Sequence, residues 1–262
     1  MPLRRLIPWL LLAALAPAGA GARPLPADVH ELLERVLQAY GGREALSSVH
    51  AYRAEGSVFS AMRHESAPTV RVFARPDRFK ALIEYEGAAE ARVADGTLVW
   101  RNEPGGSLER AEGPMWAAVV LQAARAGLPW LLMEREDDVR VTTDDAPDVF
   151  DDQARPDRNA PLIGLELPLR TGVGLRLWVD PRSFRVVVSQ GLLDHAGMRT
   201  HFATVYGDFR RVGGVLFPFH EDNWAEGMQT GITTLDRVVI DPPLRADEFR
   251  PRGPGADSDD GS

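Results

Sequence analysis

The stretch GLRLWVDPRSFRVVVS, residues 174–189, has the pattern of two short strands joined by a turn. In its halves, 174–179 and 184–189, apolar residues alternate along the chain, and Asp180-Pro181 between them is a turn signal. Strands with so short a connection pair in antiparallel fashion. Phe184, Val186 and Val188 would share one face, yet Trp178 and Val187 add apolar groups on the opposite faces. A sheet with one wet face would alternate more cleanly.

The same pattern recurs along most of the chain. Short runs rich in Val, Phe, Leu and Thr are separated by turn residues such as Asp95-Gly96 and Gly213-Gly214. The other predicted strands are 52–59, 69–74, 79–85, 91–94, 98–101, 139–143, 162–167, 200–206, 215–221 and 231–240. So many consecutive strands with short connections favour an antiparallel meander over alternating β-α-β units.

Two segments predict helices instead. In residues 29–40 the apolar side chains recur every three or four residues, Asp28 and Glu31 have capping-box spacing, and Gly41-Gly42 follows as a stop signal. Residues 43–46 predict one more short helical turn. The segment Pro114–Ala124 (PMWAAVVLQAA) begins with proline and is apolar around its whole circumference. Such a helix has to be covered on nearly every side.

The few predicted helices cannot cover so many strands. A flat sheet of about a dozen strands would curl, and curling around the helices produces a half-barrel with an apolar concave side. Two interpretations of the helix around 115–121 stay open. It fills the core permanently, or it plugs an open barrel and shifts when an apolar ligand binds, a role that suits its Met and Trp residues.

The N-terminus has the pattern of an export signal. Residues 1–22 combine Arg4 and Arg5, an apolar run over 6–15 that is too short to span a bilayer, and a cluster of small residues. We predict a cleaved signal peptide over 1–22, a single half-barrel domain over 23–252 and a disordered acidic tail over 253–262. The chain has no cysteine to carry a lipid, so we expect a soluble, unlipidated periplasmic protein.

Composition argues against several classes of function. A net charge of −8 is unfavourable for binding nucleic acid or an anionic membrane surface. Without cysteine there is neither a disulfide framework nor thiolate chemistry. The six histidines lack metal-site spacing, no G-x-S-x-G segment provides a serine nucleophile, and the acids of the loop 144–159 do not follow calcium-loop spacing.

A series of short motifs runs through the chain in a fixed order. They are YGGREAL (40–46), PDRFK (76–80), DGTLVW (95–100), LWVDPR (177–182), YGDFR with GGVLFP (206–218) and PPLRADEFRP (242–251). The series, which extends over residues 28–251, resembles that of the periplasmic lipoprotein-carrier superfamily, the Lol-type outer-membrane lipoprotein-sorting proteins. The GGREAL segment is closer to the broader branch of that superfamily than to the classical lipoprotein shuttle.

The resemblance implies a mainly β (α+β) fold, an unclosed antiparallel β-barrel of about 11 strands with an N-terminal helix and plug helices in its concave face. It also implies a carrier of lipid or lipoprotein acyl chains for outer-membrane sorting. No catalytic residues, metal or cofactor are expected, and so no enzyme. The alternative is a periplasmic sensor or interaction module that binds lipoproteins or a membrane partner without transporting them. We expect a monomer, with a membrane-associated donor or acceptor protein as a further candidate partner.

We place the ligand between the concave face of the sheet and the plug helix. The predicted ligand-binding residues are Phe73, Phe79, Leu82, Val99 and Trp100 from the sheet, Met115, Trp116, Val119, Val120 and Leu121 from the plug, Trp130 after it, and Arg78. Three roles remain open for Arg43, Arg71 and Arg78. They bind a ligand headgroup, pin the plug through its backbone carbonyls, or simply face outward.

Overall fold

The computed structural model describes residues 28–148, 161–170, 172–195 and 198–250. The predicted signal peptide (1–22), the part of the acidic loop over 149–160 and the predicted tail (253–262) lie outside the described residues.

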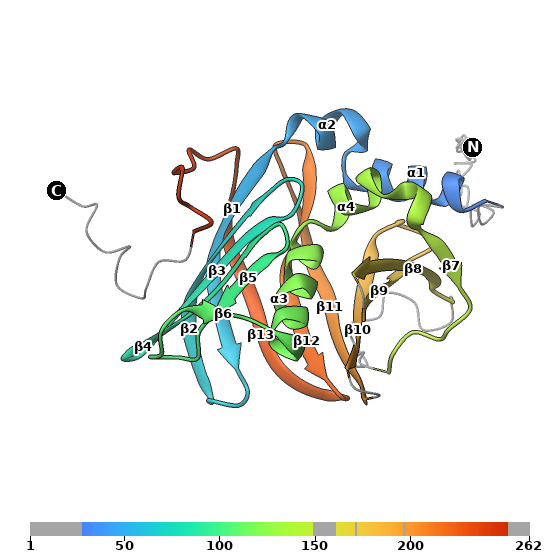
Figure 1. Cartoon of the computed structure of the whole chain (residues 1–262). Helices are drawn as coiled ribbons and strands as arrows, with labels where there is room; N and C mark the ends of the chain where they lie inside the picture. Colours follow the sequence, from blue (N-terminus) through green and yellow to red (C-terminus); the bar gives the residue numbers. More distant parts are fainter. Residues whose placement is uncertain (1–27, 149–160, 171, 196–197, 251–262) are drawn as a thin grey trace, which may run out of the picture.

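A single antiparallel sheet of thirteen strands runs through the described residues and curls without closing (Figure 1). Its strands are β1 (Ala51–Ser60), β2 (Glu65–Ala74), β3 (Arg78–Tyr85), β4 (Ala88–Asp95), β5 (Leu98–Arg101), β6 (Glu109–Arg110), β7 (Arg140–Thr142), β8 (Ile163–Arg170), β9 (Val173–Val179), β10 (Val186–His195), β11 (Met198–Val212), β12 (Val215–Ala225) and β13 (Met228–Ile240). Their spatial order is β6-β5-β4-β3-β2-β1-β13-β12-β11-β10-β9-β8-β7. The first and last strands therefore pair in the middle of the sheet.

This architecture confirms the predicted mainly β fold with an unclosed antiparallel barrel. Every predicted strand is present, but the sheet has thirteen strands rather than about eleven. The unpredicted strand β6 consists of Glu109 and Arg110, which are both exposed and polar and give no periodic signal.

Four helices and one 3-10 turn accompany the sheet in the described residues. They are α1 (Val29–Tyr40), α2 (Gly42–Ser48), α3 (Gly113–Ala126), α4 (Leu128–Glu134) and η1 (Glu136–Asp138). The carboxylate of Asp28 caps α1, accepting a hydrogen bond from His30 N at 3.2 Å. Glu31 of the expected capping box pairs with Arg35 at 2.5 Å instead.

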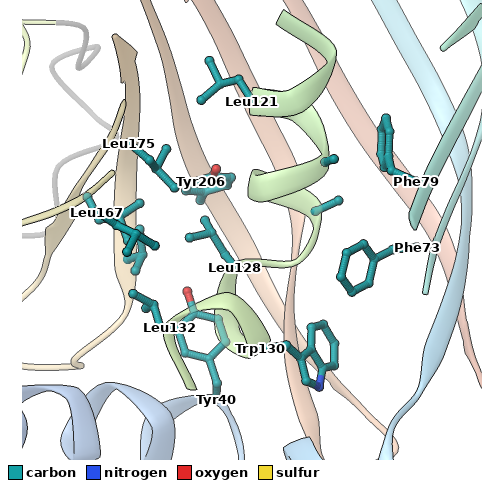
Figure 2. Packing of buried hydrophobic residues seen from close by; sticks show 14 of the residues in the cluster. Tyr40, Phe73, Phe79, Leu121, Leu128, Trp130, Leu132, Leu167, Leu175 and Tyr206 are labelled. Carbon is teal, nitrogen blue, oxygen red and sulfur yellow. The ribbon is translucent and has the colours of Figure 1, made fainter. Parts of the chain in front are cut away.

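Helix α3 occupies the concave side of the sheet (Figure 1). Figure 2 shows Phe73 and Phe79 on one side of it and Leu167 and Leu175 on the other. Glycines allow close contact, because a β-carbon on Gly127 would lie within 2.6 Å of Phe73 Cζ. The helix is therefore seated against the sheet and not loosely enclosed by it.

Within the described ranges, no single helix is long and apolar enough to cross a membrane. Helices α3 and α4 together would qualify by length and composition, but they meet at an angle of 87°. Most of their apolar residues are buried against the sheet.

The convex face also carries buried apolar clusters. Ala51, Val72 and Val93 pack there with Phe249 from the segment that follows β13. A second cluster joins Trp178 to Val188, because an irregularity in the register at Val186–Val188 turns Val188 to this side. The predicted common face for Phe184, Val186 and Val188 is therefore wrong for Val188. Apolar side chains of residues 174–189 therefore belong to two separate clusters, one on each face of the sheet.

Candidate ligand-binding site

Most of the predicted ligand-binding residues converge on α3. The buried core around that helix includes Phe73, Phe79, Val99, Val119, Val120, Leu121 and Trp130. Trp116 packs against this core, and its indole donates to Thr97 O at 3.4 Å, while Met115 is 42% exposed. Their contact with a ligand stays a prediction.

Three of the predicted residues lie on the wrong face for that role. Trp100 packs in the convex cluster with Phe249. Leu82 pairs with Val70, which belongs to the same cluster. The guanidinium of Arg78 lies 5.1 Å from the ring centre of Phe249. The prediction that Leu82 and Trp100 line the concave face is wrong, because one step along a strand moves a side chain to the opposite face. Of the three roles considered for Arg78, the structure has the outward-facing one, and its predicted contact with the ligand is wrong.

A cavity of about 230 Å³, here called the outer cleft, lies between the α3–α4 corner and the β2–β3 and β4–β5 turns. Its apolar residues are Phe73, Pro76, Ala94, Val120, Ala123, Ala124, Leu131 and Leu169, with Gly96 and Gly127, and its charged residues are Asp77, Glu134, Arg135 and Arg170. A dry apolar cavity of about 150 Å³ is enough to bind benzene. The outer cleft therefore has room for a short stretch of hydrocarbon.

Ion pairs bridge this cleft. Arg170 at the end of β8 reaches across to Asp77 Oδ2 at 3.4 Å and to the carbonyl of Gly96 at 3.3 Å. Arg75 connects β2 to α4 by pairing with Glu134 at 2.7 Å. Pairs this exposed contribute at most about 1 kcal/mol each, so they only weakly restrain opening of the cleft.

An aromatic wall, formed by Tyr52, Phe73, Trp130 and Phe217, borders the outer cleft on the inside. Its ring centres lie 5.2 to 6.0 Å apart, in tilted, stacked and edge-on arrangements. The Trp130 indole donates to Leu46 O at 2.8 Å, which fixes the ring. Figure 2 shows Phe73 and Trp130 together beside the α3–α4 corner.

Beyond the aromatic wall lies a second space of about 30 Å³, here called the inner cavity. Arg71 of β2 and Glu221 of β12 line it as a two-pronged ion pair, with N–O distances of 2.7 and 2.9 Å. The side chains keep 21% and 10% of their surface exposed although they lie deep in the half-barrel, which agrees with their position at a cavity. This space is enough for at least one water molecule, which needs roughly 10–15 Å³ by the same measure.

Arg125 of α3 lines the same inner cavity. Its Nε donates to Ser189 Oγ at 3.0 Å and its Nη2 to the carbonyl of Phe202 at 2.7 Å. Ser189 Oγ also lies 2.8 Å from the hydroxyl of Tyr206. These bonds tie α3 to β10 and β11. Arg125 is the lone charge in α3, and the sequence had not led us to predict a binding role for it.

Burial shifts the pKa values around the inner cavity. It raises the pKa of Tyr206 to about 12 and also raises that of Tyr52, so both phenols are protonated at neutral pH. Burial lowers the pKa of Arg125. Burial alone would raise the pKa of Glu221, but the facing Arg71 guanidinium outweighs it and holds the pKa below its ordinary value. The site therefore contains neutral hydroxyl groups and a tightly held ion pair.

The arginines considered from sequence have three different environments. Arg43 bonds Glu34 at 2.6 Å and Glu136 at 2.5 Å near the surface, Arg71 lies at the inner cavity, and Arg78 lies on the convex face. None of them lines the outer cleft, where Arg170 stands instead. Within the described parts of the chain, no three His, Cys, Asp or Glu side chains gather as a metal site.

Comparison with known proteins identifies the fold. No family model matches the chain, and no curated protein matches its sequence. An outer membrane lipoprotein-sorting protein domain from Vibrio parahaemolyticus superposes with a TM-score of 0.51 at 11% identity, over 85% of this chain and 97% of that one. A LolA superfamily protein from Nitrosomonas europaea gives 0.52 at 12%, over 86% and 98%. The chain has a LolA-like fold.

The LolA-like fold extends to a third group of proteins. A DUF1329 family protein from Desulfovibrio piger gives a TM-score of 0.50 at 11% identity, over 84% of this chain and 96% of that one. Nearly the whole of each neighbour is therefore matched. The agreement confirms the fold that the sequence motifs implied.

Proposed function

We propose that this protein is a non-enzymatic periplasmic carrier that holds an acyl chain of a lipid or lipoprotein in the outer cleft. The observation that carries the proposal is a 230 Å³ cleft with a largely apolar lining beside the core helix α3. Apolar burial contributes about 25 cal/mol per Å², so one acyl chain supplies several kcal/mol before ordering costs. The LolA-like fold and the lipoprotein-sorting description of one neighbour support the same class of cargo.

A full acyl chain needs more space than the outer cleft has. The partly exposed pairs Arg170–Asp77 and Arg75–Glu134 are weak connections around it. Ligand binding would then favour a state in which these pairs are broken and the α3–α4 corner has moved outward. Such a shift requires only that the ligand bind the open state better than the closed one.

The test is to fill the cleft. Ala124 lines it, so Ala124→Phe places a ring where the ligand would lie. Ala89→Phe on β4 is the matched control. Ala89 is also half-buried, but it lies five residues before Ala94 on the same strand, so its side chain is on the opposite face and points away from α3. Protein purified from the periplasm is examined by native mass spectrometry and titrated with a fluorescent fatty-acyl probe. We expect bound lipid and probe binding in the wild type and Ala89→Phe, and neither in Ala124→Phe. Absence of lipid and of probe binding in the wild type would refute the carrier.

A further inference from the structure

The inner cavity contains more positive than negative charge. Among the described residues that line it, the charged ones are Arg71, Arg125 and Glu221. The Arg71 guanidinium and the Glu221 carboxylate neutralise each other through two hydrogen bonds. No carboxylate in the described parts of the chain forms an ion pair with Arg125. Glu221 acts on Arg125 over a longer distance and is shared with Arg71, so two guanidinium groups face one carboxylate. Charged groups perturbed by burial in a cavity are candidates for functional sites.

Arg125 also keeps donor capacity. Its Nε and Nη2 bind Ser189 Oγ and Phe202 O, whereas Nη1 has no protein partner among the described residues. Nearby, the Tyr206 hydroxyl is protonated and can turn its proton toward the cavity, because Ser189 Oγ can act as donor or acceptor between them. A guanidinium with a free N–H beside a phenol is a donor set suited to one carboxylate.

Resting on the proposed carrier function, we propose that the inner cavity binds the carboxylate of a long-chain fatty acid whose hydrocarbon tail passes the aromatic wall into the outer cleft. The carboxylate supplies the missing negative charge and accepts from Arg125 and Tyr206. The small cavity volume favours a carboxylate over bulkier anionic headgroups. Among the lipids that the proposed carrier could hold, this site would then favour a free fatty acid over an esterified or amide-linked acyl chain.

The aromatic wall provides the route between the two spaces. Phe73 lines the outer cleft, Tyr52 lines the inner cavity, and Trp130, which also lines the inner cavity, stacks on both. On the side of α3 the Phe73 ring lies against Gly127, which has no side chain, and Trp130 of α4 stacks on the ring at 5.9 Å. Rotation of this one ring, together with a small movement of the α3–α4 corner, joins the outer cleft to the inner cavity.

The experiment compares palmitate, methyl palmitate and acetate by isothermal titration on the full mature chain. The acid and the ester share a tail, so their difference measures the carboxylate, and acetate measures the carboxylate without a tail. We expect palmitate to bind about tenfold or more tightly than methyl palmitate, in the range for a hydrogen bond to a charged group. Acetate is expected not to bind.

Arg125→Gln tests the residue itself. It should bring the ratio of the affinities for palmitate and methyl palmitate close to one. Arg211→Gln, a surface arginine bonded to Gly214 O, should leave that ratio unchanged. If Arg125→Gln does not fold, Tyr206→Phe provides the same readout with a smaller expected loss. Equal affinities of the wild type for acid and ester would refute the carboxylate site while leaving the carrier intact. Absence of binding by every long-chain ligand would refute both, and acetate binding as strong as that of palmitate would refute the fatty-acid assignment.

Discussion

Leu121 of α3 lies directly against Gly191 of β10, and a β-carbon added to this glycine would come within 2.6 Å of Leu121 Cδ1. The glycine is in ordinary extended backbone, so its role is to leave space and not to permit an unusual conformation. The central leucine of the plug helix thus packs where the sheet has no side chain.

We expect Gly191→Ala to destabilise the protein by about 1–3 kcal/mol, the usual cost of overfilling a packed core. Gly207→Ala on β11 is the control, because its β-carbon would meet nothing closer than 3.7 Å. Urea unfolding should show a lower midpoint for Gly191→Ala alone. In the double variant with Leu121→Ala the loss should be smaller than the sum of the two single losses, since the two changes share one contact. Equal midpoints for the two glycine variants would contradict this packing.

Breaking the ion pair between Arg71 and Glu221 should lower the free energy of unfolding by more than Gly191→Ala does. We expect Glu221→Gln to lower the free energy of unfolding by about 3–5 kcal/mol, because it leaves the buried Arg71 without its partner. The double variant Arg71→Met/Glu221→Leu should lie closer to the wild type, since it removes both charges. Chemical unfolding of the wild type, the single variant and the double variant at pH 7 tests this order of stability. A double variant that is less stable than Glu221→Gln would refute it.

The same carboxyl predicts a pH dependence. Its pKa is below the ordinary value of 4.5 in the folded chain because Arg71 outweighs the effect of burial. Its stabilising contribution is therefore complete above that value and disappears as the pH falls through the lower folded pKa. The difference in unfolding free energy between wild type and Glu221→Gln should stay constant from pH 7 to about 5 and shrink at more acidic pH. A difference that grows in acid would contradict the assigned charge state.

Weakening the ion pair across the outer cleft should change the rate of ligand uptake more than the free energy of unfolding. Asp77→Asn weakens the bridge from Arg170 and is expected to cost less than about 1 kcal/mol of stability. Uptake of a fatty-acyl probe, followed by stopped-flow fluorescence, should become several-fold faster because less of the population is closed. Asp208→Asn, which disturbs the surface pair with Arg210 elsewhere, should leave the rate unchanged. Unchanged uptake in Asp77→Asn would show that this bridge does not limit access.

Local periodicity was sufficient to predict every strand except β6, and both long helices. It failed at Leu82, Trp100 and Arg78, where the sequence does not say which side of a short strand faces the core. The deciding partner is Phe249, which returns from the end of the chain to cover the convex face. Alternation along a strand separates its side chains into two faces, but it does not say which face packs against the core.

The polar interior depends on contacts that no local pattern contains. Arg71 and Glu221 are 150 residues apart, and Arg125 reaches the carbonyl of Phe202 across 77 residues. The arginine in an otherwise apolar helix was the available sign that this helix faces something polar. Its partners became visible only once the sheet had brought β2, β10, β11 and β12 around α3.

A sheet that curls without closing has two edge strands, the margins of the sheet, whose unpaired peptide groups can pair with strands from other molecules. In the described residues the margins are β6, with two residues, and β7, with three. Very short edge strands are one of the ways in which natural sheets limit edge-to-edge pairing. The open half-barrel thus presents its two shortest strands where other molecules could add to the sheet.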